Sequence, residues 1–103
     1  MTKRYQIYIT GNVQRVGFRS HAHKYANKLN ISGMAMYIDH AIMIDAEGEP
    51  DKLSDFIEWC RLGPDSCFID GFEITELPPR YQQGFDLVHG VVSSKKLSDL
   101  FVN

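Results

Sequence analysis

The order in which two hydrophobic periodicities follow one another most constrains how this chain of 103 residues can fold. Residues 4–10 alternate apolar and polar side chains, which is typical of a strand with one face buried. From Phe18 to Leu29 the apolar residues instead recur at helical spacing and predict an amphipathic helix. The two patterns continue downstream, and the predicted order is strand, helix, strand, strand, helix, strand and one additional strand.

Turn and cap residues set the limits of the later elements. A tight turn is predicted at 39–41, and Pro50 between two acidic residues suits the first turn of a second helix. Gly63, followed by a proline, ends that helix. Besides the first strand, the predicted strands are 33–39, 42–46, 67–77 and 84–89. We expect three residues of the strand 67–77 to reach the core: Phe68, Phe72 and Ile74.

These elements predict an α+β domain that forms a ferredoxin-like βαββαβ sandwich. Short, right-handed connections place two helices on one face of a mostly antiparallel sheet of four to five strands. A chain of this length forms one hydrophobic core and needs neither a disulfide nor a metal in order to fold.

Composition and charge exclude several classes of protein. The 11 Lys and Arg residues against 13 Asp and Glu give a net charge of −2, which argues against a general nucleic-acid binder. The chain has no run of about 18 apolar residues that could span a membrane, and its first residues lack the apolar region of a secretory signal. We therefore expect a cytoplasmic protein without nucleic-acid or membrane partners, and we expect it to be monomeric.

The cysteines and histidines form no recognisable metal or redox motif. Cys60 and Cys67 have neither the spacing of a zinc site nor the Cys-x-x-Cys arrangement, so we expect reduced thiols. His21 and His23 point in different directions on the predicted helix, so no shared metal is expected there.

The segment from Gly11 to Arg19 carries the strongest functional signal. It joins a predicted strand to a predicted helix, where backbone N–H groups lack intrahelical partners and can converge on an anion. Gly17 permits a backbone conformation that other residues avoid, as such a nest of N–H groups requires. The segment therefore predicts an anion-binding loop.

Two arginines strengthen this prediction. Arg15 and Arg19 lie beside the positive end of the predicted helix, where a cation is unfavourable by roughly 0.3–1 kcal/mol. A bound anion would offset that cost, and Arg19 can hold two oxygens of a phosphate or a carboxylate. The alternative, from position and charge alone, is that both arginines are solvated or paired with surface carboxylates.

This loop resembles the signature loop of the acylphosphatases, small ferredoxin-like hydrolases of acyl phosphates. The residues that carry the resemblance are Gly11-x-Val13-Gln14-x-Val16-Gly17-Phe18-Arg19. Other segments similar to the family are Gly33, Ala46-Glu47-Gly48, Phe56-x-x-Trp59-x-x-x-Gly63-Pro64 and Gly84-Phe85-Asp86. The resemblance covers about residues 4–89, so we assign 1–90 to an acylphosphatase-like domain and 91–103 to a C-terminal extension.

The resemblance implies cleavage of a carboxyl–phosphate bond to a carboxylate and inorganic phosphate, with no metal and no organic cofactor. Expected ligands are a small acyl phosphate, inorganic phosphate or sulfate, held by the loop amides and neutralised by Arg19. An acyl phosphate already has a good leaving group, so positioning and charge stabilisation suffice for the reaction. The residues expected to bind the phosphate are Gln14, Arg15, Val16, Gly17, Phe18 and Arg19.

The chain departs from the family at two positions. Counting from Gly33, the asparagine that positions the attacking water in the family is replaced by Tyr37. A phenol offers one donor and acceptor on a longer and stiffer arm than a carboxamide, so Tyr37 either holds the water or is an aromatic that suits a strand. Arg15 stands where most relatives have glycine.

Three functional interpretations follow from the loop and its departures. In the first, the chain is a hydrolase with Arg19 and Tyr37 as its catalytic residues. In the second, it is a non-catalytic phosphate-binding or anion-binding module that has lost the water-positioning asparagine. In the third, it is a protein-interaction module that works through residues 91–103.

Overall fold

The computed structural model of the chain describes residues 1–14, 17–65 and 67–92, with the backbone alone for 89–92. Both predicted helices and all five predicted strands are present, and the last strand is longer than predicted. The elements are β1 (Lys3–Asn12), α1 (Phe18–Lys28), β2 (Ser32–Ile38), β3 (Ala41–Gly48), α2 (Pro50–Leu62), β4 (Phe68–Leu77) and β5 (Phe85–Val92).

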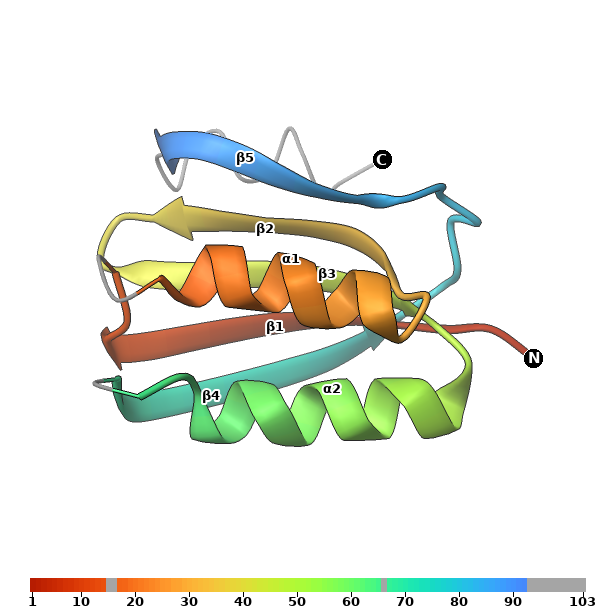
Figure 1. Cartoon of the computed structure of the whole chain (residues 1–103), viewed down its shortest axis with the longest axis horizontal. Coiled ribbons are helices and arrows are strands. Elements are labelled where there is room, and N and C mark those ends of the chain that lie inside the picture. The colour runs from red at the N-terminus through yellow and green to blue at the C-terminus, as the bar shows by residue number, and fades with distance from the viewer. Residues whose placement is uncertain (15–16, 66, 93–103) are drawn as a thin grey trace.

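The five strands form one sheet in the order β4-β1-β3-β2-β5. Neighbouring strands are antiparallel except β2 and β5, which run parallel. Figure 1 shows α1 and α2 on the same face of this sheet. The predicted ferredoxin-like fold is confirmed, and β5 is the additional strand, placed beside β2 at the edge.

The hydrophobic core lies between the two helices and the sheet. Ile7 and Ile9 of β1 point into it, as their alternation predicts, and they pair with Ile44 and Ile42 of β3. All four are fully buried, and burying each such side chain contributes about 1.5–3 kcal/mol. The buried residues of the helices are Phe18, Ala22, Ala26, Leu53, Phe56 and Cys60.

The limits of α2 follow the predicted signals. Glu49 is the N-cap residue, Pro50 occupies the first turn, and Asp51 lies beside it at the positive end of the helix. Gly63 ends the helix with φ 72°.

The prediction for β4 is wrong for two of the three residues expected in the core. Phe68 is 65% exposed and Ile74 is 38% exposed, whereas Phe72 is half-buried and packs against the core. Because β4 lies at the edge of the sheet and pairs with β1 alone, its side chains receive cover from one neighbouring strand only.

A β-bulge explains the exposure of Phe68. Thr10 pairs with Gly71, but the next residue of β1, Gly11, pairs with Ile69, so β4 contains one extra residue at this point. An extra residue reverses which side chains face the core. Ile69 therefore packs against the core in place of Phe68.

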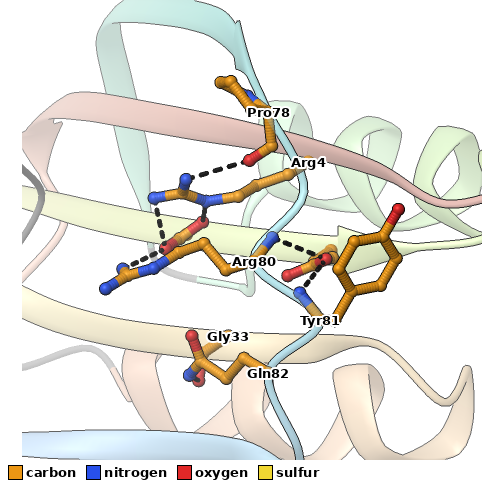
Figure 2. A network of polar contacts seen from close by, with 8 residues as sticks. Arg4, Gly33, Pro78, Arg80, Tyr81 and Gln82 are labelled. Atoms are coloured by element: carbon orange, nitrogen blue, oxygen red, sulfur yellow. Dashed lines mark hydrogen bonds and ion pairs between the residues drawn. The ribbon is translucent and has the colours of Figure 1, made fainter. Parts of the chain in front are cut away.

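The connection 78–84 between β4 and β5 is anchored by a buried ion pair on the sheet face opposite the helices (Figure 2). The guanidinium of Arg4 in β1 binds the carboxylate of Asp45 in β3, and its Nη1 donates to the Pro78 carbonyl oxygen at 3.1 Å. The connection is thereby fixed to β1.

The same connection is then tied to β3 and β2. The carboxylate of Glu47 in β3 accepts hydrogen bonds from the backbone N–H groups of Arg80 and Tyr81, at 3.0 and 2.7 Å. The side chain of Gln82 donates to the carbonyl oxygen of Gly33 in β2 at 3.2 Å. Residues 78–84 therefore cross three strands and are hydrogen-bonded to each.

Candidate functional site

The predicted anion-binding loop ends at the first turn of α1. Gly17 caps this helix with φ 77° and ψ 16°, a left-handed conformation that glycine adopts at little cost. The conformation expected of this glycine is confirmed. Among the described residues, no side chain caps this end of the helix and no acidic residue lies in its first turn.

The carbonyl oxygen of Gly17 is held by the following turn of the helix. The backbone N–H of His21 donates to it at 3.0 Å, and Nδ1 of the His21 ring lies 2.7 Å from the same oxygen. Since a carbonyl only accepts, Nδ1 of His21 is the donor in this contact. His21 therefore fixes the orientation of the peptide that joins the loop to α1.

The side chain of Gln14 ties the loop to the turn between β2 and β3. Its Nε2 donates to the carbonyl oxygens of Asp39 and Ala41, each at 3.0 Å. Asp39 has φ 51°, so this turn holds a left-handed residue. Each hydrogen bond contributes about 0.5–1.5 kcal/mol, and together they keep the loop beside the β2–β3 hairpin.

Arg19 and Tyr37, the two residues predicted to be catalytic, are in contact. The Cζ atom of Arg19 lies 4.1 Å from the centre of the Tyr37 ring, over its face. A guanidinium within about 6 Å of an aromatic centroid is attracted by the negative face of the ring. Tyr37 is half-buried and packs against the hydrophobic core, which holds its ring in place.

Arg19 also contacts a carbonyl oxygen of β5. Nη1 of Arg19 donates to the carbonyl oxygen of Val88. The pairing of β2 with β5 is irregular here, because Ala35 and Tyr37 are two residues apart on β2 while their partners on β5 are four apart. Val88 lies in the longer stretch between those partners, where the regular ladder is interrupted. Three elements, α1, β2 and β5, therefore meet at the guanidinium.

The other residues predicted to bind phosphate are Phe18, Arg15 and Val16, and none of them has a described side chain at the Arg19–Tyr37 contact. Phe18 is fully buried, and its ring contacts Trp59 edge-on with centroids 5.2 Å apart, so its side chain belongs to the core. Only the backbone N–H of Phe18 is available to the loop. Arg15 and Val16 lie outside the described residues, so the convergence of the amides of 14–18 on an anion stays a prediction.

Two cavities lie away from Arg19 and Tyr37. A groove of about 410 Å³ begins one helical turn after Gly17 and is lined by His21, Lys24, Tyr25, Lys28 and Trp59. Another, of about 310 Å³, lies where the 78–84 connection approaches the start of α2, and its lining includes Glu47, Lys52 and Tyr81.

Residues 1–14, 17–65 and 67–92 contain neither a cluster of metal-ligating side chains nor a membrane-spanning helix. Within these ranges, no three His, Cys, Asp or Glu side chains lie close enough together to hold a metal ion. None of the helices described there is both long enough and apolar enough to cross a bilayer.

Both cysteines are free thiols. Cys60 is fully buried in α2, and burial raises the pKa of its thiol far above the ordinary value. Cys67 is half-buried, and burial raises its pKa as well. Their thiols are therefore poor nucleophiles at neutral pH.

Comparison with known proteins identifies the family. The family model described as Acylphosphatase matches residues 5–87. The chain belongs to the acylphosphatase family. The matched range includes the whole predicted site and ends before the residues assigned to the C-terminal extension.

Individual acylphosphatases are similar in sequence and structure. An acylphosphatase of Legionella pneumophila (strain Paris) is 38% identical over 82 residues, which cover 79% of this chain and 90% of the relative. The crystal structure of the acylphosphatase from Bacillus subtilis superposes with a TM-score of 0.81 at 28% identity, over 86% of this chain and 100% of that one.

A similar structure also occurs within a much larger protein. Full-length HypF, crystallised in a phosphate- and nucleotide-bound form, superposes with a TM-score of 0.85 at 28% identity over 91% of this chain. The chain spans only 12% of the length of HypF.

The side-chain hydrogen bonds of His21, Gln14 and Arg19 in this member of the acylphosphatase family were not predicted from its sequence. His21 follows Gly17 by four residues, and that helical spacing is the signal that could have indicated the contact. Gln14 and Arg19 both donate to backbone carbonyls of distant strands. Every residue has a carbonyl, so no sequence pattern marks the one that a side chain reaches.

Proposed function

We propose that this chain is an acylphosphatase that hydrolyses the carboxyl–phosphate bond of a small acyl phosphate. Membership of the family over residues 5–87 supports this function. At the level of residues, the observation that carries it is the placement of Arg19. This arginine lies in the first turn of α1, directly after the left-handed Gly17 and Phe18, and its guanidinium is held by the ring of Tyr37.

The substrate phosphate is proposed to bind the loop amides and the guanidinium together. Backbone N–H groups at a helix start, next to a left-handed residue, form a concave site for an oxyanion. The guanidinium adds a full positive charge and planar donors that match phosphate oxygens. The proposed binding residues are Gln14, Arg15, Val16, Gly17, Phe18 and Arg19.

In the proposed reaction, a water oxygen attacks phosphorus while the bond between phosphorus and the bridging oxygen breaks. The electron pair of that bond remains on the bridging oxygen, which leaves as part of a carboxylate and needs no proton. A proton of the water passes to a phosphate oxygen and then to solvent, and the second product is inorganic phosphate. Such a reaction requires positioning and charge stabilisation from the protein, and the proposal includes no metal or organic cofactor.

One observation favours a second candidate, a module that binds phosphate without hydrolysing it. The guanidinium of Arg19 lies over the ring of Tyr37, and by its resemblance to the family the chain has Tyr37 in place of the water-positioning asparagine. In the hydrolase, Tyr37 would have to serve at that position; in the binding module, its place in the site would leave the water unpositioned.

The proposed setting is a cytoplasmic monomer that acts on small molecules, without nucleic-acid or membrane partners. The net charge of −2 supports the part of this proposal that concerns nucleic acid, because binding to phosphate backbones depends on an excess of positive charge.

The test is the release of phosphate from a small acyl phosphate such as benzoyl phosphate. We expect turnover by the wild type and a loss of about 100-fold or more in Arg19→Ala, as for removal of one donor to a developing oxyanion. Arg61→Ala is the matched control, since Arg61 also lies over an aromatic ring, that of Phe72, at 4.4 Å. An inactive wild type that Tyr37→Asn activates would establish the binding module instead. A wild type that neither hydrolyses the substrate nor binds phosphate would overturn both candidates.

A further inference from the structure

We propose that Tyr37 is a positioning residue whose aromatic ring, rather than its hydroxyl, holds the guanidinium of Arg19 in the orientation that binds phosphate. This inference rests on the proposed function, because it assigns a role within the same site. It gives the residue that replaces the family's asparagine a task that an asparagine cannot perform, since a carboxamide has no aromatic face.

The contacts of Tyr37 involve its ring. The ring face lies under Arg19, with 4.1 Å between Cζ and the ring centre, and the ring packs against the hydrophobic core. The hydroxyl makes no hydrogen bond to any other residue in the part of the chain that the structure describes. The arrangement therefore uses the aromatic surface of this side chain and leaves the phenol without a structural task.

Two of the contacts of the Arg19 guanidinium involve described residues that restrain it from different directions. The ring of Tyr37 contacts its flat face, and the carbonyl oxygen of Val88 accepts a hydrogen bond from Nη1 at its edge. Stacking on the flat face consumes none of the five N–H donors of a guanidinium. The ring can therefore fix the orientation of the arginine without competing with a phosphate for hydrogen bonds.

An arginine binds an anion more tightly when its side chain is already oriented before binding, because a long side chain has many rotamers to lose. A free arginine must give up rotational freedom when it binds an anion, and a residue that restricts the side chain beforehand removes part of that cost. The interruption of the β2–β5 ladder beside Tyr37 supplies the second restraint, since Val88 lies within it. Loss of the ring is thus expected to weaken phosphate binding, whereas loss of the hydroxyl is not.

Two variants separate the ring from the hydroxyl. Tyr37→Phe keeps the ring and removes the hydroxyl, and Tyr37→Leu removes the ring and keeps an apolar side chain against the core. Phe72→Leu is the matched control, because it removes another ring that lies under an arginine: Cζ of Arg61 is 4.4 Å from the centre of the Phe72 ring. For each variant we would measure the dissociation constant of inorganic phosphate, kcat and KM with benzoyl phosphate, and the NMR shift of the Arg19 Nε–H proton, which a stacked ring displaces.

In Tyr37→Phe we expect a phosphate dissociation constant within about twofold of the wild type and a retained ring-induced shift of Arg19. In Tyr37→Leu we expect the dissociation constant and KM to rise about three- to tenfold and the shift to disappear. Phe72→Leu should change none of these quantities. If Tyr37→Leu does not fold, as judged by circular dichroism, Tyr37→Met provides an unbranched apolar replacement.

Two results would overturn the inference. In the first, Tyr37→Phe binds phosphate as weakly as Tyr37→Leu does. In the second, Tyr37→Leu binds phosphate as tightly as the wild type does. A wild type that binds phosphate without hydrolysing benzoyl phosphate would overturn the proposed turnover alone, and the comparison of dissociation constants would still decide the role of the ring. A wild type that binds no phosphate would overturn both.

Discussion

Arg4 and Asp45 are joined by two hydrogen bonds although 41 positions separate them in the chain. The Nε of Arg4 lies 2.8 Å from Oδ1 of Asp45, and its Nη2 lies 3.1 Å from Oδ2. The two residues are only 5% and 1% exposed, and the Arg80 guanidinium approaches the same carboxylate at 3.6 Å. Charges this deeply buried are tolerated only when they are paired, so each partner depends on the other.

We therefore expect Asp45→Ala to lower the free energy of unfolding by about 3–5 kcal/mol, because it leaves the buried guanidinium of Arg4 without its counter-charge. Replacing both partners with apolar residues, as in Arg4→Met with Asp45→Leu, should recover much of this loss. Urea denaturation measures both effects. The control is Glu58→Ala, which removes an exposed ion pair with Arg61 and should cost less than about 1 kcal/mol. Equal losses in Asp45→Ala and the control would contradict the expectation.

The left-handed conformation of Gly17 can be tested against a second glycine. Gly17→Ala and Gly84→Ala both introduce a side chain at a positive φ, 77° and 74°, and each should cost about 1–2 kcal/mol of stability. A Cβ atom at Gly17 would also lie 3.2 Å from Nδ1 of His21, whereas nothing lies within 4 Å of one at Gly84. Phosphate release should fall by about tenfold or more in Gly17→Ala only. If both variants lose activity equally, the loop conformation is not what the reaction requires.

The hydrogen bonds of Gln14 give a third prediction. Gln14→Ala removes both bonds to the β2–β3 turn and should lower the free energy of unfolding by about 1–2 kcal/mol. Because the loop is then less firmly held, KM for an acyl phosphate should rise while kcat changes less. Steady-state kinetics and urea denaturation test this. Gln83→Ala, at an exposed glutamine, is the control, and a variant of Gln14 that behaves like it would show that the anchor is unimportant.

Cys60 predicts how stability depends on pH in the alkaline range. Burial raises the pKa of its thiol, so the folded state retains a proton that the unfolded state releases near the ordinary pKa of about 8.5. The folded state then binds more protons than the unfolded state. The free energy of unfolding should therefore fall as pH rises above that value, by up to about 1.4 kcal/mol per pH unit for this group.

Urea denaturation at several pH values from about 7 to about 10 measures this slope. Cys60→Ala should lower the stability at neutral pH, because it leaves a cavity in the core, but it should remove the contribution of this thiol to the slope. An unchanged slope in Cys60→Ala would assign the pH dependence to other groups. Cys67→Ala provides the comparison with a half-buried thiol, whose pKa is also raised.

The features that depend only on residues close together in the sequence could be predicted from it. The alternation of Ile7 and Ile9 placed one face of β1 in the core, and Pro50 marked the start of α2. The conformation of Gly17 also followed from its place between a strand and a helix. Arg19 and Tyr37 were both chosen as candidates, yet nothing in their spacing indicated that one would stack on the other.

The errors and omissions arise where distant segments meet. The bulge that exposes Phe68 depends on how β4 aligns with β1. The alternation of apolar and polar residues within one strand does not determine that alignment. The pairing of Arg4 with Asp45 likewise depends on the register of β1 against β3. The contact of Arg19 with Val88 depends on an interruption between β2 and β5. Each of these is a property of two segments together.

The bulge in β4 also affects how two molecules of this chain can meet. Asp70, Glu73 and Glu76 are exposed along this outer strand, and edges that are both charged and kinked resist pairing with a strand from another molecule. Two copies approaching there would bring like charges together before their backbones could align. Extension of the sheet from one molecule into the next, as in a fibril, is therefore discouraged along this margin, even in concentrated solution.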